Sequence, residues 1–133
     1  MNGILLISQG NLAEGMRDTL ELFSGKVNQL DAVTLFAGQD ISEFSVNLER
    51  KINGIDTGEG VVIFCDLAFG APTSIVIKLL VNLEHREKIQ VITGMNLPLV
   101  LAYSQLRSKK IDFNDIVEVG KSGIINLNES LIS

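Results

Sequence analysis

The sequence predicts a doubly wound α/β domain, with a mostly parallel four-stranded sheet and helices on both faces. Three observations lead to this prediction. Short, unbroken apolar runs such as 4–7 and 61–64 have the length and composition of strands that are buried on both faces. Each run is followed by a turn and then by a segment with apolar residues at helical spacing. Strands that alternate with helices in this way form parallel sheets with right-handed crossovers.

The first strand and the first helix meet at the loop 8–10, which reads Ser-Gln-Gly. Asn11 is of a type that often caps helices, and Glu14 stands three positions later, as in a capping box. We therefore expect Asn11 to cap a helix that stops at Gly25. The apolar stripe of this helix consists of Leu12, Met16, Leu20 and Phe23.

The second unit joins a strand over 29–36 to a helix that Asp40 caps. The apolar stripe of this helix consists of Ile41, Phe44, Leu48, Ile52 and Ile55. The glycine-rich segment 53–60 then forms a loop.

The third unit begins with the strand 61–64. After a loop with glycine and proline, we expect Thr73 or Ser74 to cap a helix that ends near residue 83. This helix is apolar nearly all round, and a helix without a polar face is buried on both sides. In a domain of this size, we expect one of those sides to face another subunit.

The last part of the chain predicts two more strands and two more helices. The polar segment 84–88 reads as a solvated turn before a strand over 90–93. Pro98 suits the first turn of a helix, and Asp112 suits the cap of a shorter one. The segment 123–127, which reads Gly-Ile-Ile-Asn-Leu, predicts a short C-terminal strand.

Length and composition narrow the class of protein. A chain of 133 residues suits one domain with a real core, and we expect this domain, 1–133, to be free-standing. The net charge of −5 and the lack of a basic stripe argue against nucleic-acid binding. A single Cys excludes an internal disulfide, and no apolar run has the length of a membrane span or the form of a signal peptide. We therefore expect a cytoplasmic protein.

Three loops are expected to meet at the carboxyl edge of the parallel sheet, where α/β proteins bind ligands. These loops, 8–10, 66–72 and 94–98, bring Gln9, Asp66 and Asn96 into one neighbourhood with two helix N-termini. Helix N-termini favour anions, but a bare carboxylate repels a phosphate. A phosphate could bind beside the Asp66 carboxylate if a protonated group, such as an imidazole N–H, stood between the phosphate and the carboxylate.

Four segments carry a resemblance to a known family: SQG-NLAEGM, VVIFCD-LAFGAP, TGMNLPLVLA and VEVGKSGIINL. In this order they resemble the enzyme IIA subunit of the mannose-class bacterial sugar phosphotransferase system, over nearly the whole chain. The most specific pieces are the Asn-Leu-Pro that follows a strand ending in Gly and the Asp-x-x-x-Gly-x-Pro loop.

The resemblance implies roles for residues in two loops. In that family the first loop reads Ser- or Thr-His-Gly, and its His takes a phosphoryl group from the carrier protein HPr and passes it to subunit IIB. Gln9 stands at this phosphoacceptor position, between Ser8 and Gly10. Asp66 stands where the family has the Asp that orients the His. The IIC/IID membrane permease would be an indirect partner.

The second loop departs from the family pattern Asp-x-x-Gly-Gly-Ser-Pro. Gly70 and Pro72 match it, whereas Phe69 replaces the first Gly and Ala71 replaces the Ser. We expect Phe69 to fill room that the family leaves open and Ala71 to remove a donor to phosphate. Asn96 matches the family without change, as do the Leu and Pro that follow it.

Position 9 carries the most consequential departure, because a Gln amide nitrogen is delocalised into its carbonyl and is not a nucleophile at neutral pH. Two functions therefore compete. The first is the IIA step of the relay from HPr to IIB, for sugar uptake. The second is a phosphorylation-incompetent regulatory or binding paralogue. A third, weaker alternative is a sensor of small anions at the helix N-termini.

Each site residue also has a structural interpretation. Gln9 either contacts a ligand or partner or is an inert loop residue, and Asp66 either orients a catalytic group or satisfies loop N–H groups. We expect Asn96 to hold its loop in place rather than to bind a ligand.

Other residues offer weaker candidates. His85 is the only histidine and would lie at the amino edge of the sheet, the wrong edge for the site. Cys65 reads as a small buried hydrophobe, with a reactive thiol as the minority alternative. No nucleotide-binding fingerprint is present, and one Cys with one His cannot build a zinc site, so we expect no cofactor and no metal.

The resemblance also implies a homodimer in which the C-terminal strand pairs with a partner subunit.

Overall fold

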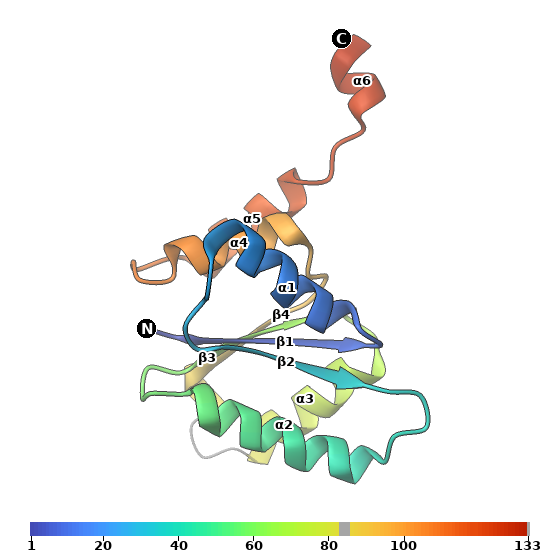
Figure 1. Cartoon of the computed structure of the whole chain (residues 1–133), viewed down its shortest axis with the longest axis vertical. Helices are drawn as coiled ribbons and strands as arrows, with labels where there is room; N and C mark the ends of the chain where they lie inside the picture. Colours follow the sequence, from blue (N-terminus) through green and yellow to red (C-terminus); the bar gives the residue numbers. More distant parts are fainter. Residues whose placement is uncertain (83–85, 133) are drawn as a thin grey trace.

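The fold is a three-layer α/β arrangement around one parallel sheet (Figure 1). The computed structural model describes residues 1–82 and 86–132. Its four strands are β1 (Gly3–Gln9), β2 (Leu30–Leu35), β3 (Val61–Cys65) and β4 (Ile89–Ile92), in the order β2-β1-β3-β4 and all parallel. The helices are α1 (Leu12–Ser24), α2 (Ile41–Ile55), α3 (Ala71–Asn82), α4 (Leu97–Leu106), α5 (Phe113–Ser122) and α6 (Leu127–Ile132), and the short 3-10 helix η1 spans Arg86–Lys88. The predicted fold class is confirmed.

The core lies on both faces of the sheet, as the unbroken apolar runs predict. Helices α1, α4 and α5 cover one face, and α2 and α3 cover the other (Figure 1). The apolar residues of β1 and β3 are fully buried, because these are the two central strands. Alternate residues of each strand therefore contribute to the two core clusters, such as Leu6 to one and Leu5 to the other.

The two edge strands differ in how they are protected. In β2, the Asp31 carboxylate accepts hydrogen bonds from Arg17 of α1 at 3.0 Å and from Lys51 of α2 at 3.1 Å. Charges on an edge strand discourage pairing with another chain. Beside β4 there is instead a groove of about 480 Å³, lined by β4, by α5 and by Ile124. The β4 edge is thus the more open of the two.

Helix caps confirm some predictions and correct others. The Asp40 carboxylate accepts from Ser42 N at 2.8 Å and the Asp112 carboxylate from Asn114 N at 2.9 Å, as predicted. The predicted cap at Asn11 is wrong, because its side chain makes no capping hydrogen bond. The partner of Glu14 is Arg17, at 2.6 Å, rather than the backbone of residue 11.

Helix α3 begins earlier than predicted, at Ala71. Neither Thr73 nor Ser74 caps it. Both hydroxyls lie inside the helix and donate to carbonyl oxygens of the preceding loop. One side of α3 packs on the sheet, whereas Ile77 on the other side is 56% exposed. The second side of α3 is therefore not buried within the single chain, and its burial against another subunit stays a prediction.

The predicted C-terminal strand at 123–127 is wrong for the single chain. Residues 124–126 form no strand, and α6 begins at Leu127 and projects away from the body of the molecule (Figure 1). A strand is defined by hydrogen bonds to a neighbour, and the segment that follows α5 has no neighbouring strand within its own chain. Ile124 and Ile125 are exposed as a result.

The connection from α3 to β4 is described only in part. Residues 83–85 lie outside the described residues, so the predicted turn at 84–88 is seen only in η1, whose Lys88 is exposed.

Among the helices in the described ranges, none has both the length and the apolar character needed to cross a membrane.

Candidate functional site at the carboxyl edge of the sheet

Gln9 and Asp66 lie side by side at the carboxyl ends of the two central strands. The backbone N–H of Gln9 donates to Asp66 Oδ2 at 2.9 Å, and the backbone N–H of Asp66 donates to Ile7 O at 3.2 Å. The first of these contacts joins residues that are 57 positions apart in the sequence. The parallel register of β1 and β3 is what brings them together, as the sequence predicts.

The Asp66 carboxylate is held by the loops around it. Besides the Gln9 N–H at Oδ2, its Oδ1 accepts from the backbone N–H of Leu67 at 2.8 Å. Gly70 approaches closely, since a Cβ built on it would lie 3.9 Å from Asp66 Oδ1. Two roles were considered for Asp66. In the described residues its carboxylate accepts hydrogen bonds from loop N–H groups, which is the structural role.

Ser8, rather than Asn11, organises the start of α1. The fully buried Ser8 hydroxyl accepts from Ala13 N at 2.8 Å and donates to Gly10 O at 3.0 Å. Gly10 has a φ of +64°, a conformation that favours glycine, and its N–H donates to Leu35 O at 3.2 Å. The loop that carries Gln9 is therefore fixed on one side by β2 and on the other by Asp66.

Asn96 holds the third loop in place, as predicted. Its Oδ1 accepts from Leu99 N at 3.0 Å and caps α4, and its Nδ2 donates to Gly120 O at 2.9 Å. Both polar ends of the amide are thus used inside the fold. Met95, buried beneath the start of α4, donates its backbone N–H to Cys65 O at 3.0 Å and so ties this loop to β3.

Phe69 does not fill the site, contrary to the sequence-based expectation. Its side chain is 101% exposed and projects into solvent from the loop between β3 and α3. Backbone geometry rather than side-chain size decides this, because residues 67–70 form a tight turn that points outward. Ala71 is also exposed, and it lines a groove of about 500 Å³ between α2 and α3.

An apolar rim that was not predicted from the sequence surrounds this site. Its members follow or begin the elements at the carboxyl edge, and all are more than half exposed: Leu12, Phe36, Leu67 and Phe69. The signal is present in the sequence, since apolar residues stand in loops where polar ones are usual. It becomes interpretable only when the sheet order places these loops around Gln9.

The loops at this edge contain acidic groups and no basic ones. The segments 8–11, 36–40, 66–70 and 93–96 hold two carboxylates, Asp40 and Asp66, and no Lys, Arg or His. A free phosphate would therefore meet negative charge without a cationic side chain from these loops. This arrangement disfavours the small-anion sensor.

Of the remaining candidates, Cys65 offers no reactive group to the site. Burial is the main cause that raises the pKa of the Cys65 thiol to about 11. The nearby Asp66 charge raises this pKa further, whereas a hydrogen bond with Thr73 lowers it. The thiol is thus protonated and inert at neutral pH, as the first interpretation predicts. His85 lies outside the described residues. Among residues 1–82 and 86–132, no group of three or more potential metal ligands is found.

The all-parallel sheet, with paired loops at the carboxyl ends of its two central strands, defines a doubly wound α/β protein. The chain belongs to the family described as PTS system fructose IIA component, whose profile matches residues 3–119. This membership confirms the resemblance to the mannose-class IIA subunit.

Relatives named as phosphotransferase components support the membership. The mannose-specific EIIAB component of Escherichia coli (strain K12) is 24% identical over 125 residues, which are 91% of this chain and 38% of that protein. The chain thus spans about two fifths of the length of this relative. YadI of the same strain, named as a candidate phosphotransferase enzyme IIA component, is 30% identical over 130 residues, or 96% of this chain and 87% of that protein.

Solved structures show the same fold. The PTS IIA protein associated with the fucose utilization operon from Streptococcus pneumoniae has a TM-score of 0.89 and 27% identity, over 98% of this chain and 96% of that one. EIIA from Streptococcus agalactiae has a TM-score of 0.83 and 23% identity, over 97% of this chain and 99% of that one. The second likeness concerns the fold alone.

Proposed function

We propose that the chain acts as the IIA-type component of a bacterial mannose-class sugar phosphotransferase system, at the step between HPr and IIB, in the cytoplasm. The IIC/IID permease is its indirect partner in sugar uptake. The observation that carries this proposal is the pairing of position 9 with Asp66 at the carboxyl edge, within a chain that belongs to the IIA family. The names of its relatives fit this function better than a separate regulatory one.

A second candidate function is favoured by one observation, the amide at position 9. The Gln9 side chain provides no nucleophilic nitrogen, so the scaffold keeps the docking loops without the acceptor group. A phosphorylation-incompetent paralogue would bind its partners through the same face. The relay function requires HPr to dock at the carboxyl edge, whereas the paralogue would use this edge for IIB or another regulatory partner. Docking of HPr is therefore tested first.

Addition of unphosphorylated HPr to the isotopically labelled chain is expected to shift backbone amide NMR signals around the site. The largest shifts should fall on Gln9, Leu67 and Phe69, because they lie on the exposed side of the carboxyl edge. Amides at the opposite edge, such as that of Lys109, provide the internal control. Shifts centred on the opposite edge, or no shifts at all, would contradict the proposed docking.

We also propose that two copies of the chain associate through the C-terminal segment that follows α5. This proposal rests on the family resemblance and on two features of the structure: β4 has an open edge beside a groove, and Ile124 and Ile125 are exposed next to it. Pairing with β4 of a second copy would supply the strand neighbour that the segment lacks within its own chain.

Sedimentation equilibrium is expected to show a dimer for the wild-type chain and a monomer for the double variant Ile124→Asp, Ile125→Asp. Two buried carboxylates without partners would make the interface unfavourable. Val46→Asp, which adds a charge at a position that is 69% exposed on α2, should remain dimeric. A wild-type chain that sediments as a monomer would refute the proposed association.

A further inference from the structure

Five backbone N–H groups around Gln9 and at the nearby helix starts are already hydrogen-bonded within the fold. Asp66 accepts from the N–H groups of Gln9 and Leu67, and the N–H of Gly10 is used by Leu35 O. At the helix starts, Ala13 N is taken by the Ser8 hydroxyl and Leu99 N by the Asn96 amide. The Asp66 carboxylate thus acts as a built-in anion that holds the donors nearest to Gln9.

The charge balance of the face works in the same direction. A phosphoryl group carries close to two negative charges at neutral pH. It would approach a face whose loops hold Asp40 and Asp66 and no cationic side chain. An imidazole at position 9 would stand between the phosphoryl group and Asp66 and relieve this repulsion, but the amide of Gln9 is neutral and cannot become a cation.

The apolar rim, in contrast, does not depend on the charge of the partner. Phe69 is fully exposed and Leu67 is 58% exposed, and large apolar side chains exposed around a site mark a protein-binding surface. The partner can therefore gain apolar contacts in either of its states, while only its phosphorylated state meets the repulsion.

Resting on the second candidate function, a IIA-like chain that is not itself phosphorylated, we infer that this face discriminates between the two forms of HPr and binds the unphosphorylated form more tightly. The chain then responds to the phosphorylation state of the relay through the population of free, unphosphorylated HPr. Gln9 and Asp66 are its selectivity residues, and the rim formed by Leu12, Phe36, Leu67 and Phe69 supplies affinity.

Titration calorimetry with the full chain, at low salt, tests this inference with unphosphorylated HPr and with phosphorylated HPr freed of enzyme I. We expect the dissociation constant for phosphorylated HPr to be larger by about tenfold or more, and the ratio to shrink as salt screens the charges. Intact mass confirms that the chain itself stays unmodified during the titration.

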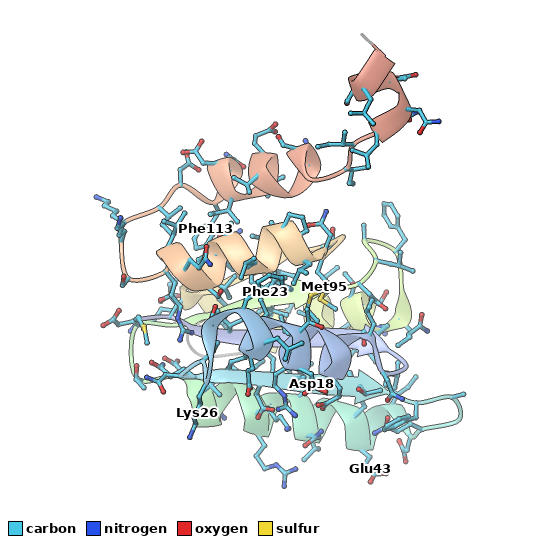
Figure 2. All side chains as sticks on the ribbon, turned by 45° about the horizontal axis from the view of Figure 1, so that its top comes forward. Asp18, Phe23, Lys26, Glu43, Met95 and Phe113 are labelled. Carbon is cyan, nitrogen blue, oxygen red and sulfur yellow. The ribbon has the colours of Figure 1, made fainter. Side chains whose placement is uncertain are left out.

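Asp66→Asn should bring the ratio close to one, because it removes the repelling charge while keeping one acceptor oxygen. Asp112→Asn is the control, since the Asp112 carboxylate also accepts a backbone N–H bond, from Asn114 N, whereas Asp66 accepts two. Asp112 lies beside Phe113, which Figure 2 shows at the opposite end of the α4–α5 layer from Met95. This control should keep the ratio of the wild type.

The outcomes separate the inference from the proposed function. Equal affinities or a preference for phosphorylated HPr would overturn the inference alone. Transfer of the phosphoryl group to the wild-type chain would overturn both the inference and the second candidate function, and would support the relay function. Binding to neither form would overturn HPr docking itself, and with it the proposed function. The comparison of the two HPr forms uses the wild-type chain, so it stands even if Asp66→Asn fails to fold.

Discussion

Replacing Gln9 by His is expected to change a chain that gains no phosphoryl mass into one that is modified at about one group per chain. The assay is intact mass after incubation with phosphoenolpyruvate, enzyme I and HPr. An imidazole nitrogen at position 9 would attack the phosphorus of phosphorylated HPr. The bond from phosphorus to HPr would break, a nitrogen–phosphorus bond would form, and the imidazole would release a proton.

The scaffold around position 9 already suits this chemistry. Asp66 Oδ2 lies 2.9 Å from the backbone nitrogen of Gln9, and Gly10 with its positive φ holds the loop open to solvent. An oriented carboxylate beside an imidazole fixes its tautomer and stabilises its charged form. Because Phe69 points outward, no side chain from that position blocks the approach.

Gln105→His provides the matched control, because it introduces the same imidazole at an exposed position near the end of α4. It should not be phosphorylated. A phosphoryl mass on the wild-type chain would refute the interpretation of Gln9 and require the acceptor to be mapped, beginning with His85. If neither the wild type nor Gln9→His gains mass, the regulatory or binding function becomes the better supported one.

Gly60→Ala is expected to cause the largest loss of stability among single methyl additions, about 3 kcal/mol or more. Gly60 has a φ of +103°, and a Cβ built on it would lie 2.2 Å from the backbone oxygen of Lys88. Its own carbonyl also accepts from Gly3 N at 3.0 Å, so the backbone cannot move away without loosening the start of β1. Urea denaturation measures the change in the free energy of unfolding.

Gly58→Ala separates the two causes of this loss. Gly58 has a similar φ of +112°, but a Cβ added to it would meet no atom within 4 Å. It should therefore show only the backbone strain, about 1 kcal/mol. Equal losses for the two variants would mean that the close approach of Lys88 contributes nothing, and that the β3 entry adapts freely.

The order of the main strands and helices as far as α5, and the edge of the sheet at which the candidate site lies, follow from the sequence alone. Apolar runs without polar positions indicate central strands of a parallel sheet, and β1 and β3 are fully buried as this pattern requires. Local caps were also predictable where one side chain decides them, as at Asp40 and Asp112. These features are readable because they depend on neighbours within a few positions in the chain.

Predictions failed where a distant partner decides the outcome. Asn11 has the residue type of a cap, but the Ser8 hydroxyl takes the Ala13 N–H because the buried end of β1 places it there. The apolar segment 123–127 has the composition of a strand, but a strand needs a neighbour that the single chain does not offer. Phe69 is large and apolar, yet the turn that carries it points outward.

By itself, the sequence determined the α/β class of the domain, the turns that precede its helices and the amide at position 9, because composition, periodicity and motif spacing are local properties. Only the tertiary structure decided what Asp66 does. The register between β1 and β3 brings its carboxylate against the backbone of Gln9, where it accepts hydrogen bonds from the N–H groups of Gln9 and Leu67. That contact joins two loops far apart in the chain, and no pattern within either loop encodes it.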